Sequence, residues 1–273
     1  MLVEIKILGT FQASVCGASV VPTARKQRQV LALLALNPGQ MVTSAALIDE
    51  IWGARPPRLP LSSLQTYILH LRKSLSLALA GSDRTAKEVL VTGSTGYVFE
   101  VPSGVVDAGK YGQLVETGRR ALGHGDFAAA SRVLSDALSL WRGQALVDVA
   151  VGPQLQVERT RLEESRLSTL DLRVEADLRL GRHRMVLDEL AALCTQHPWF
   201  ENFHAQYMLA LHRSGTPWRA LEVYRRLHSA VGKYLGVAPS RHLRQLHQAI
   251  LTGDPVVDDP GFAASDWVAR RSA

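Results

Sequence analysis

The stretch LSSLQTYILHLRKSLSLAL (61–79), followed after a polar break by EVLVTG (88–93) and GYVFEV (96–101), decides the fold of the first part of the chain. In the first segment, apolar residues recur every three or four positions and predict the buried stripe of an amphipathic helix, formed by Leu61, Leu64, Ile68, Leu71 and Leu75. The two later segments are β-prone and meet at Ser94-Thr95, which predicts a hairpin. A polar-faced helix backed by a hairpin points to a domain that binds nucleic acid.

The face of this helix opposite the leucine stripe carries side chains suited to DNA. Glutamine can pair with an adenine edge, histidine, arginine and lysine with guanine acceptors, and hydroxyl or cationic groups with phosphates. The predicted DNA contacts of the helix are Ser62, Ser63, Gln65, Thr66, His70, Arg72 and Lys73. An ordinary surface helix with a solvated face has the same pattern, so the helix alone leaves both interpretations open.

The segments before this helix complete a familiar order of elements. The sequence predicts short strands at 3–8 and 11–13, a core helix with a basic start at 24–36, and a second helix at 44–52. Arg55–Pro60 contains three prolines and cannot be helical throughout, so we expect an exposed loop there. Strands, three helices and a terminal hairpin predict an α+β winged helix-turn-helix. The basic start of the 24–36 helix offers candidate phosphate contacts at Arg25, Lys26 and Arg28.

The sequence of this region resembles the OmpR/PhoB-type DNA-binding domain and, more specifically, the small Streptomyces antibiotic regulatory proteins. The matching segments are LGTFQASVCGASVVPTARKQRQVLALLALNPGQMV (8–42), LIDEIWG (47–53), LQTYILHLRKSL (64–75) and GYVFEVP (96–102). The resemblance implies that the third helix enters the major groove, that the hairpin wing touches the adjacent minor groove, and that the loop after the second helix faces RNA polymerase. PhoB-like members and several antibiotic regulators have Arg at the position of His70, which leaves a direct and a water-mediated base contact open there.

By position, the resemblance also implies roles for residues outside the third helix. The implied wing contacts are Thr92, Ser94, Thr95 and Tyr97. The implied contacts with RNA polymerase holoenzyme are Trp52, Arg55 and Arg58.

The second part of the chain is helical in pattern from Gly109 to Ile250, with glycine-containing breaks. Gly181 and Gly215 are 34 residues apart, which is the period of tetratricopeptide helical hairpins. A longer interval before Gly181 predicts an inserted charged helix at 154–180. We therefore expect an all-α tetratricopeptide-like helical-repeat domain. The predicted divisions are 1–103 for the winged helix, 104–252 for the repeats and 253–273 for a flexible tail.

This helical region also resembles the bacterial transcriptional activation domain of the same regulators. The phrases that carry the resemblance are LWRGQALVDV (140–149), RLEESRL (161–167) and HAQYMLALHRSGTPWRALEVYRRL (204–227). The resemblance implies roles in dimer formation and in transcription activation. Exposed-looking aromatics, Trp199, Phe200 and Trp218, favour a partner surface over a helical core that binds nothing, although aromatics also fill cores.

Composition agrees with these expectations. The chain has 273 residues and a formal charge of +6, and residues 1–103 hold ten basic against six acidic side chains. Two cysteines without a CxxC spacing indicate neither a zinc site nor a disulfide framework. With no signal segment and no long apolar run, the sequence predicts a cytoplasmic, nucleoid-associated protein without a membrane partner. The absence of GxxxxGK[ST], HExxH and GxSxG motifs predicts a protein that is not an enzyme and has no cofactor, metal or catalytic residue.

The resemblance implies a sequence-specific activator of an antibiotic gene cluster. Such a protein would bind direct repeats in double-stranded promoter DNA as a homodimer and recruit RNA polymerase. Two alternatives remain open at this point. One is a helical-repeat adaptor that binds proteins, and the other is a repressor with the same DNA-binding domain.

Overall fold

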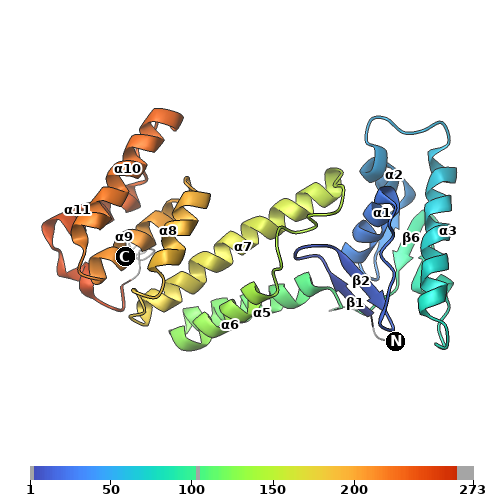
Figure 1. Ribbon diagram of the computed structural model, residues 1–273, viewed down its shortest axis with the longest axis horizontal. Helices are drawn as coiled ribbons and strands as arrows, with labels where there is room; N and C mark the ends of the chain where they lie inside the picture. Colours follow the sequence, from blue (N-terminus) through green and yellow to red (C-terminus); the bar gives the residue numbers. More distant parts are fainter. Residues whose placement is uncertain (1–2, 103–104, 263–273) are drawn as a thin grey trace. The chain divides into compact units, whose positions relative to one another are not determined.

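The computed structural model describes residues 3–102 and 105–262 (Figure 1). Its first elements are β1 (Val3–Lys6), β2 (Gln12–Val15), β3 (Ala18–Ser19), α1 (Arg25–Leu36), β4 (Met41–Thr43), α2 (Ser44–Trp52), α3 (Pro60–Ala78), α4 (Ala86–Val89), β5 (Leu90–Thr92) and β6 (Gly96–Phe99). The later elements are α5 (Asp107–Gly123), α6 (Phe127–Ser139), α7 (Pro153–Arg179), α8 (Leu187–Gln196), α9 (Glu201–Arg213), α10 (Pro217–Leu235), α11 (Arg241–Thr252) and the 3₁₀ helix η1 (Pro255–Asp258). The predicted α+β winged-helix region followed by helices is confirmed.

The N-terminal sheet is an antiparallel meander in the order β1-β2-β3. Its register pairs Val3 with Val15 and Ile5 with Ala13, and all four of these side chains are buried. Because side chains alternate between the two faces of a strand, these apolar residues form one inner face. The strands predicted at 3–8 and 11–13 are present with slightly shifted ends.

Helices α1, α2 and α3 pack against one another (Figure 1), and each contributes buried apolar residues. On α3 the buried residues include Leu64, Ile68, Leu71 and Leu75, as the spacing predicts. Leu61 is an exception, because it is exposed in the first turn of the helix. The periodicity places it on the stripe, but α3 begins at Pro60, where the helix extends past the core.

The wing belongs to a second sheet with the strand order β4-β6-β5. The hairpin turns at Ser94-Thr95 as predicted, and the amide of Gly93 donates to the carbonyl oxygen of Gly96 over 2.9 Å. Strand β4, which pairs with β6, was not expected, because three residues between two helices carry no readable alternation. At Gly96 the two strands lie so close that a Cβ atom would overlap the carbonyl oxygen of Val42.

The described chain divides into two compact units. The N-terminal unit extends to Leu114 and also includes Asp136–Leu167, whereas the helical unit contains Val115–Ser135 and the residues from Ser168 onward. This division differs from the boundary predicted at 103/104. The reason is that later residues bond to the winged helix: the amide of Ile7 donates to Asp107 over 2.8 Å, and the amide of Arg142 donates to the carbonyl oxygen of Leu8 over 2.8 Å.

The helical unit is a succession of hairpins. Helices α8, α9, α10 and α11 pack each against the next along the chain. Gly181 and Gly215 have φ angles of 73° and 83°, a backbone conformation that glycine adopts without strain, so each ends a helix at the predicted turn. The predicted inserted helix at 154–180 is α7.

The prediction of a flexible tail from residue 253 needs correction over the part that the structure describes. The guanidinium of Arg213 donates to the carbonyl oxygens of Val257, Asp259 and Phe262 over 2.6 to 2.8 Å. The side chain of Phe262 is buried. This segment is therefore held against α9, and the rest of the predicted tail, 263–273, lies outside the described residues.

Candidate nucleic-acid interface

The polar face of α3 is accessible to a ligand. Five of the predicted contacts are exposed: Ser62, Gln65, Thr66, His70 and Lys73. The hydroxyl groups of Ser63 and Thr66 donate to the carbonyl oxygens of Leu59 and Ser62, so they bind their own helix, and Ser63 is only half-exposed. Helix α3 contains no acidic residue, and its exposed face therefore presents neutral and cationic groups only.

His70 joins α3 to α1. Its Nδ1 atom lies 2.8 Å from Nε2 of Gln27, at hydrogen-bonding distance. This contact orients the imidazole ring while leaving the side chain exposed. His70 thus places a polar group on the face of α3 that is predicted to bind DNA, and Gln27 of α1 holds its ring in position.

Arg72 has a different place from the one predicted. Its Nε and Nη2 atoms donate to the carbonyl oxygen of Leu90 over 3.0 and 2.7 Å, and Nη2 also donates to the hydroxyl of Thr92 over 2.7 Å. A planar guanidinium with donors fixed in a fork suits such a bridge. Arg72 therefore ties α3 to β5 and positions the wing.

The wing presents three of its four predicted residues. Thr92, Ser94 and Thr95 are exposed around the hairpin turn. The prediction for Tyr97 is wrong, because its side chain is only 7% exposed. Tyr97 lies on β6, the central strand of the sheet, where all four residues are buried. Its aromatic ring fills the core of the domain.

The three basic residues at the start of α1 differ in their exposure and in their partners. Arg25 and Lys26 are exposed and remain candidate phosphate contacts. Arg28 is instead engaged within the protein, because its Nη1 atom forms an ion pair of 2.8 Å with Asp148, and its Nε atom donates to the carbonyl oxygen of Pro22. Asp148 lies 120 positions away in the sequence, so no local pattern could reveal this partner.

The predicted polymerase-facing residues lie at the end of α2 and in the loop after it. The ring of Trp52 stacks on Tyr67 with 6.0 Å between centroids, and Nζ of Lys26 lies 5.1 Å from its centroid. Trp52 is half-exposed in this stack, whereas Arg55 and Arg58 are exposed. The loop residues are free to meet a partner, and Trp52 also helps to hold α2 against α3.

Sequence reasoning missed α4 and its lysine. Beside α3 lies a hollow of about 640 Å³, lined by Leu69, His70, Arg72, Lys73, Ser76, Thr85, Ala86 and Lys87. Lys87 is exposed on α4, so it and Lys73 supply two cations to this hollow. A capping box of Thr85 and Glu88 starts α4, and this T-x-x-E spacing was a readable signal inside the polar break.

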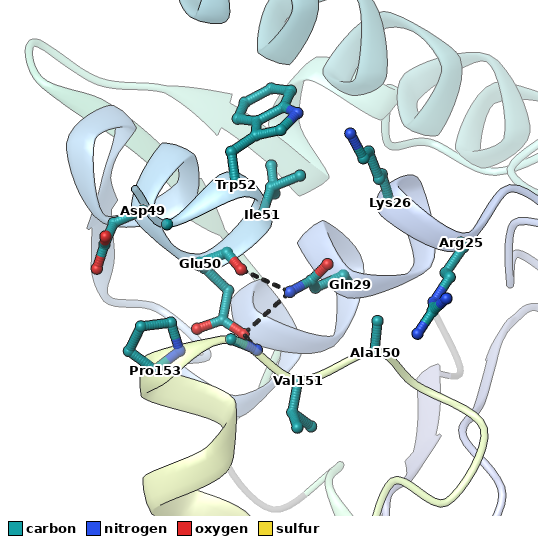
Figure 2. Close-up of a pocket in the computed structure, with 12 residues that line it drawn as sticks. Arg25, Lys26, Gln29, Asp49, Glu50, Ile51, Trp52, Ala150, Val151 and Pro153 are labelled. Atoms are coloured by element: carbon teal, nitrogen blue, oxygen red, sulfur yellow. Dashed lines mark hydrogen bonds between the residues drawn. The ribbon is translucent and has the colours of Figure 1, made fainter. Parts of the chain in front are cut away.

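A second polar cluster, also missed, surrounds Glu50 on α2 (Figure 2). Glu50 is only 2% exposed. Its carboxylate accepts from the amides of Gly152, Gln154 and Leu155 over 2.5 to 3.2 Å, at the start of α7. Figure 2 also shows the amide group of Gln29 bonded to both the carbonyl oxygen and the carboxylate of Glu50.

We call this cluster the Glu50 junction (Gln29, Glu50, Gly152, Gln154 and Leu155), and three of its members, Gln29, Glu50 and Gly152, line a pocket of about 380 Å³. A carboxylate is favourable there because the first amides of a helix lack partners within it and carry positive partial charge. The junction therefore fixes α2 to the start of α7. Its acceptors are filled by the protein, which makes it a structural element.

Over 3–102 and 105–262, no helix is both long and apolar enough to cross a membrane. The same residues contain no group of three or more metal-ligating side chains that could hold an ion.

Family models match two consecutive parts of the chain. The model described as "Transcriptional regulatory protein, C terminal" matches residues 18–99. The model described as "Bacterial transcriptional activator domain" matches residues 106–251. The first match covers the exposed face of α3 and the wing, and the second covers more than half of the whole chain.

Individual proteins show the same likeness. The chain is 47% identical to "Regulatory protein DnrI" of Streptomyces peucetius, over 94% of this chain and 95% of that protein. It is 35% identical to "Regulatory protein AfsR" of Streptomyces coelicolor, over 95% of this chain but 25% of that protein. A solved structure of Mycobacterium tuberculosis EmbR in complex with a low-affinity phosphopeptide superposes with a TM-score of 0.86 at 31% identity. That superposition covers 99% of this chain and 71% of EmbR.

Proposed function

This chain belongs to the Streptomyces antibiotic regulatory protein family of DNA-binding transcription activators, and we propose that it activates an antibiotic biosynthetic gene cluster by recruiting RNA polymerase to promoter DNA. We further propose that it binds direct repeats as a homodimer, at the nucleoid in the cytoplasm. Members of the family are regulators and not enzymes, and this applies to the present chain.

The observation that carries the proposal is the exposed, acid-free face of α3 beside the exposed tip of the wing. An α-helix fits the major groove of B-DNA, where base edges present a distinct pattern for each base pair. Arg72 holds β5 against this helix. Because α3 and the wing are already held together before DNA binds, little conformational entropy is lost when they contact adjacent grooves.

We assign these contacts from the exposed side chains of α3, α4, the wing and the start of α1, and from Ser63, which is half-exposed. The proposed groove and phosphate contacts of α3 are Ser62, Ser63, Gln65, Thr66, His70 and Lys73, and the proposed wing contacts are Thr92, Ser94 and Thr95. The proposed phosphate contacts are Arg25, Lys26 and, newly, Lys87. Arg72 positions the wing, while Arg28 and Tyr97 stabilise the fold.

The proposed contacts with RNA polymerase are Trp52, Arg55 and Arg58. Arg55 and Arg58 are exposed in a proline-rich loop whose backbone angles are restricted, so little conformational entropy is lost when a partner binds. Trp52 extends this surface from the end of α2.

Binding is tested first with DNA. Upstream regions of the neighbouring genes are footprinted, and the affinity for a protected fragment is measured over a range of salt concentrations. The logarithm of the affinity should fall linearly with the logarithm of salt, because Lys and Arg displace counterions from phosphates. An affinity that is flat across salt would support the protein-binding adaptor instead and overturn the proposal.

Activation is tested with purified RNA polymerase on the same fragment. An activator raises the amount of transcript, whereas a repressor lowers it. The double variant Arg55→Ala/Arg58→Ala should lower transcript yield while leaving the affinity for DNA nearly unchanged. Equal losses in both measurements would remove the loop from the proposed polymerase surface.

A further inference from the structure

Leu69 lies on the exposed face of α3 that we propose binds DNA, and its side chain does not contribute to the core. Leu69 is 65% exposed, whereas its neighbours Ile68 and Leu71 are buried. The fold therefore gains almost nothing from an apolar side chain at this position, and a polar residue would be as well suited to folding there. The exposed side chains next to Leu69 on this face, Gln65, Thr66, His70 and Lys73, are polar or cationic.

Helical geometry places Leu69 among the proposed groove contacts. At 3.6 residues per turn, residues four positions apart lie about 40° apart around the axis. Gln65 and Lys73 are each four positions from Leu69, so they lie on either side of it along the same strip of the helix. Leu69 therefore faces the same part of a bound duplex as these two side chains.

The charges around Leu69 favour a nucleic acid as the group that covers it. The hollow beside α3 has Leu69 and Ala86 in its lining together with Lys73 and Lys87. Two lysines next to an apolar surface can hold a phosphate backbone in place while the leucine faces the bases. Since α3 contains no acidic residue, nothing on the helix repels the DNA from this point.

In the major groove one base carries an apolar group, the C5 methyl of thymine, and apolar side chains contact it. We propose that Leu69 is a specificity-determining residue that contacts a thymine methyl group in the operator. This inference rests on the proposed function, because it presumes that α3 enters the major groove.

Uracil tests the contact, because deoxyuridine differs from thymidine only in lacking this methyl group. Binding sites are first selected from a random duplex pool with the full-length protein. Each thymine of a selected site is then replaced singly by deoxyuridine, and affinities are measured for the wild type, Leu69→Ala and Leu77→Ala. Leu77 is the matched control, because it is also an exposed leucine of α3 but lies eight positions, or about 12 Å along the helix axis, beyond Leu69.

For the wild type, we expect one replacement to weaken binding by about fourfold, which corresponds to roughly one buried methyl group. Leu69→Ala should bind the thymine duplex about fourfold more weakly and lose nothing further with uracil at that position. Leu77→Ala should keep the full difference between thymine and uracil.

The inference is overturned if Leu69→Ala retains the thymine preference, or if no replacement affects the wild type. In either case sequence-selective, salt-dependent binding still supports the proposed function. Absence of any salt-dependent binding by the wild type would overturn both.

Discussion

The exposed face of α3 and the Glu50 junction are both made of polar side chains on helices of the N-terminal unit, yet they differ in what those side chains bind. At the junction a buried carboxylate accepts from three backbone amides and a glutamine side chain. On α3, Gln65 and Lys73 are exposed on a strip that carries no acid. Polar groups that the protein has partnered stabilise the fold, and exposed ones can bind a ligand. Arg28 and Lys73 illustrate this difference, because both are basic residues that the sequence predicts to contact DNA, yet Arg28 is paired with Asp148 whereas Lys73 is exposed.

The largest loss of stability should follow from removing the carboxylate of the Glu50 junction. Glu50→Ala leaves three amides at the start of α7 without their acceptor, and we expect the free energy of unfolding to fall by about 3 kcal/mol. Asp49→Ala is the matched control, since this neighbouring carboxylate is exposed, and it should change stability by less than about 0.5 kcal/mol. Urea denaturation followed by circular dichroism measures both. Equal effects of the two variants would mean that the junction is no more structural than the surface.

Alanine substitutions at two glycines of the wing, Gly96 and Gly93, should differ in their effect on stability. An alanine Cβ at position 96 overlaps the backbone of β4, so Gly96→Ala should cost about 2 kcal/mol of stability. At position 93 the overlap is with the end of the Met41 side chain, which is exposed and can rotate away. Gly93→Ala should therefore be nearly neutral. Thermal denaturation of the two variants makes the comparison, and a stable Gly96→Ala protein would show that the β4-β6 contact can relax.

Two basic residues should separate stability from DNA binding. Lys73→Ala should reduce the slope of log affinity against log salt by about 0.9, with stability unchanged, because it removes one phosphate contact. Arg28→Ala should leave that slope unchanged and lower the free energy of unfolding by about 1 kcal/mol, because it breaks the ion pair with Asp148. Salt titrations of binding and urea denaturation are both needed. A reduced salt slope for Arg28→Ala would return this residue to the DNA interface.

The helical unit offers an intermediate case, the half-buried carboxyl group of Asp171, whose burial is only partly offset by hydrogen bonds. Burial, opposed in part by a hydrogen bond from Asn202, raises the pKa of Asp171 to about 6. Its other partner, Gln206, has a buried Oε1 atom with no hydrogen-bond partner in the described part of the chain.

A raised carboxyl pKa means that the folded state holds its proton to higher pH than the unfolded state. Stability therefore falls as pH rises from about 4 to about 6, and it is lowest above that range. Relative to Asp171→Asn, the wild type should lose about 1 kcal/mol of unfolding free energy between pH 5 and pH 7. Urea denaturation of both proteins at each pH measures this difference, and a constant difference would contradict the raised pKa.

Much of the fold could be predicted because its signals are local. The leucine spacing of α3, the glycine turns at Gly181 and Gly215, and the hairpin at Ser94-Thr95 all depend on residues within one or two turns of the chain. The exposed part of the proposed interface was also predictable, since a polar residue opposite an apolar stripe faces solvent wherever the helix packs.

The roles of individual polar and aromatic side chains were decided only by tertiary structure. The sequence by itself determined which helices are amphipathic and which of their faces must be buried. It could not determine that Arg28 binds Asp148, that Glu50 caps α7, or that Tyr97 lies on the central strand of its sheet. The partners of Arg28 and Glu50 are more than 100 residues away, and strand order is likewise a long-range property. Hydrophobic periodicity is set by neighbours along the chain, whereas a hydrogen bond is set by whichever group the completed fold brings within 3 Å.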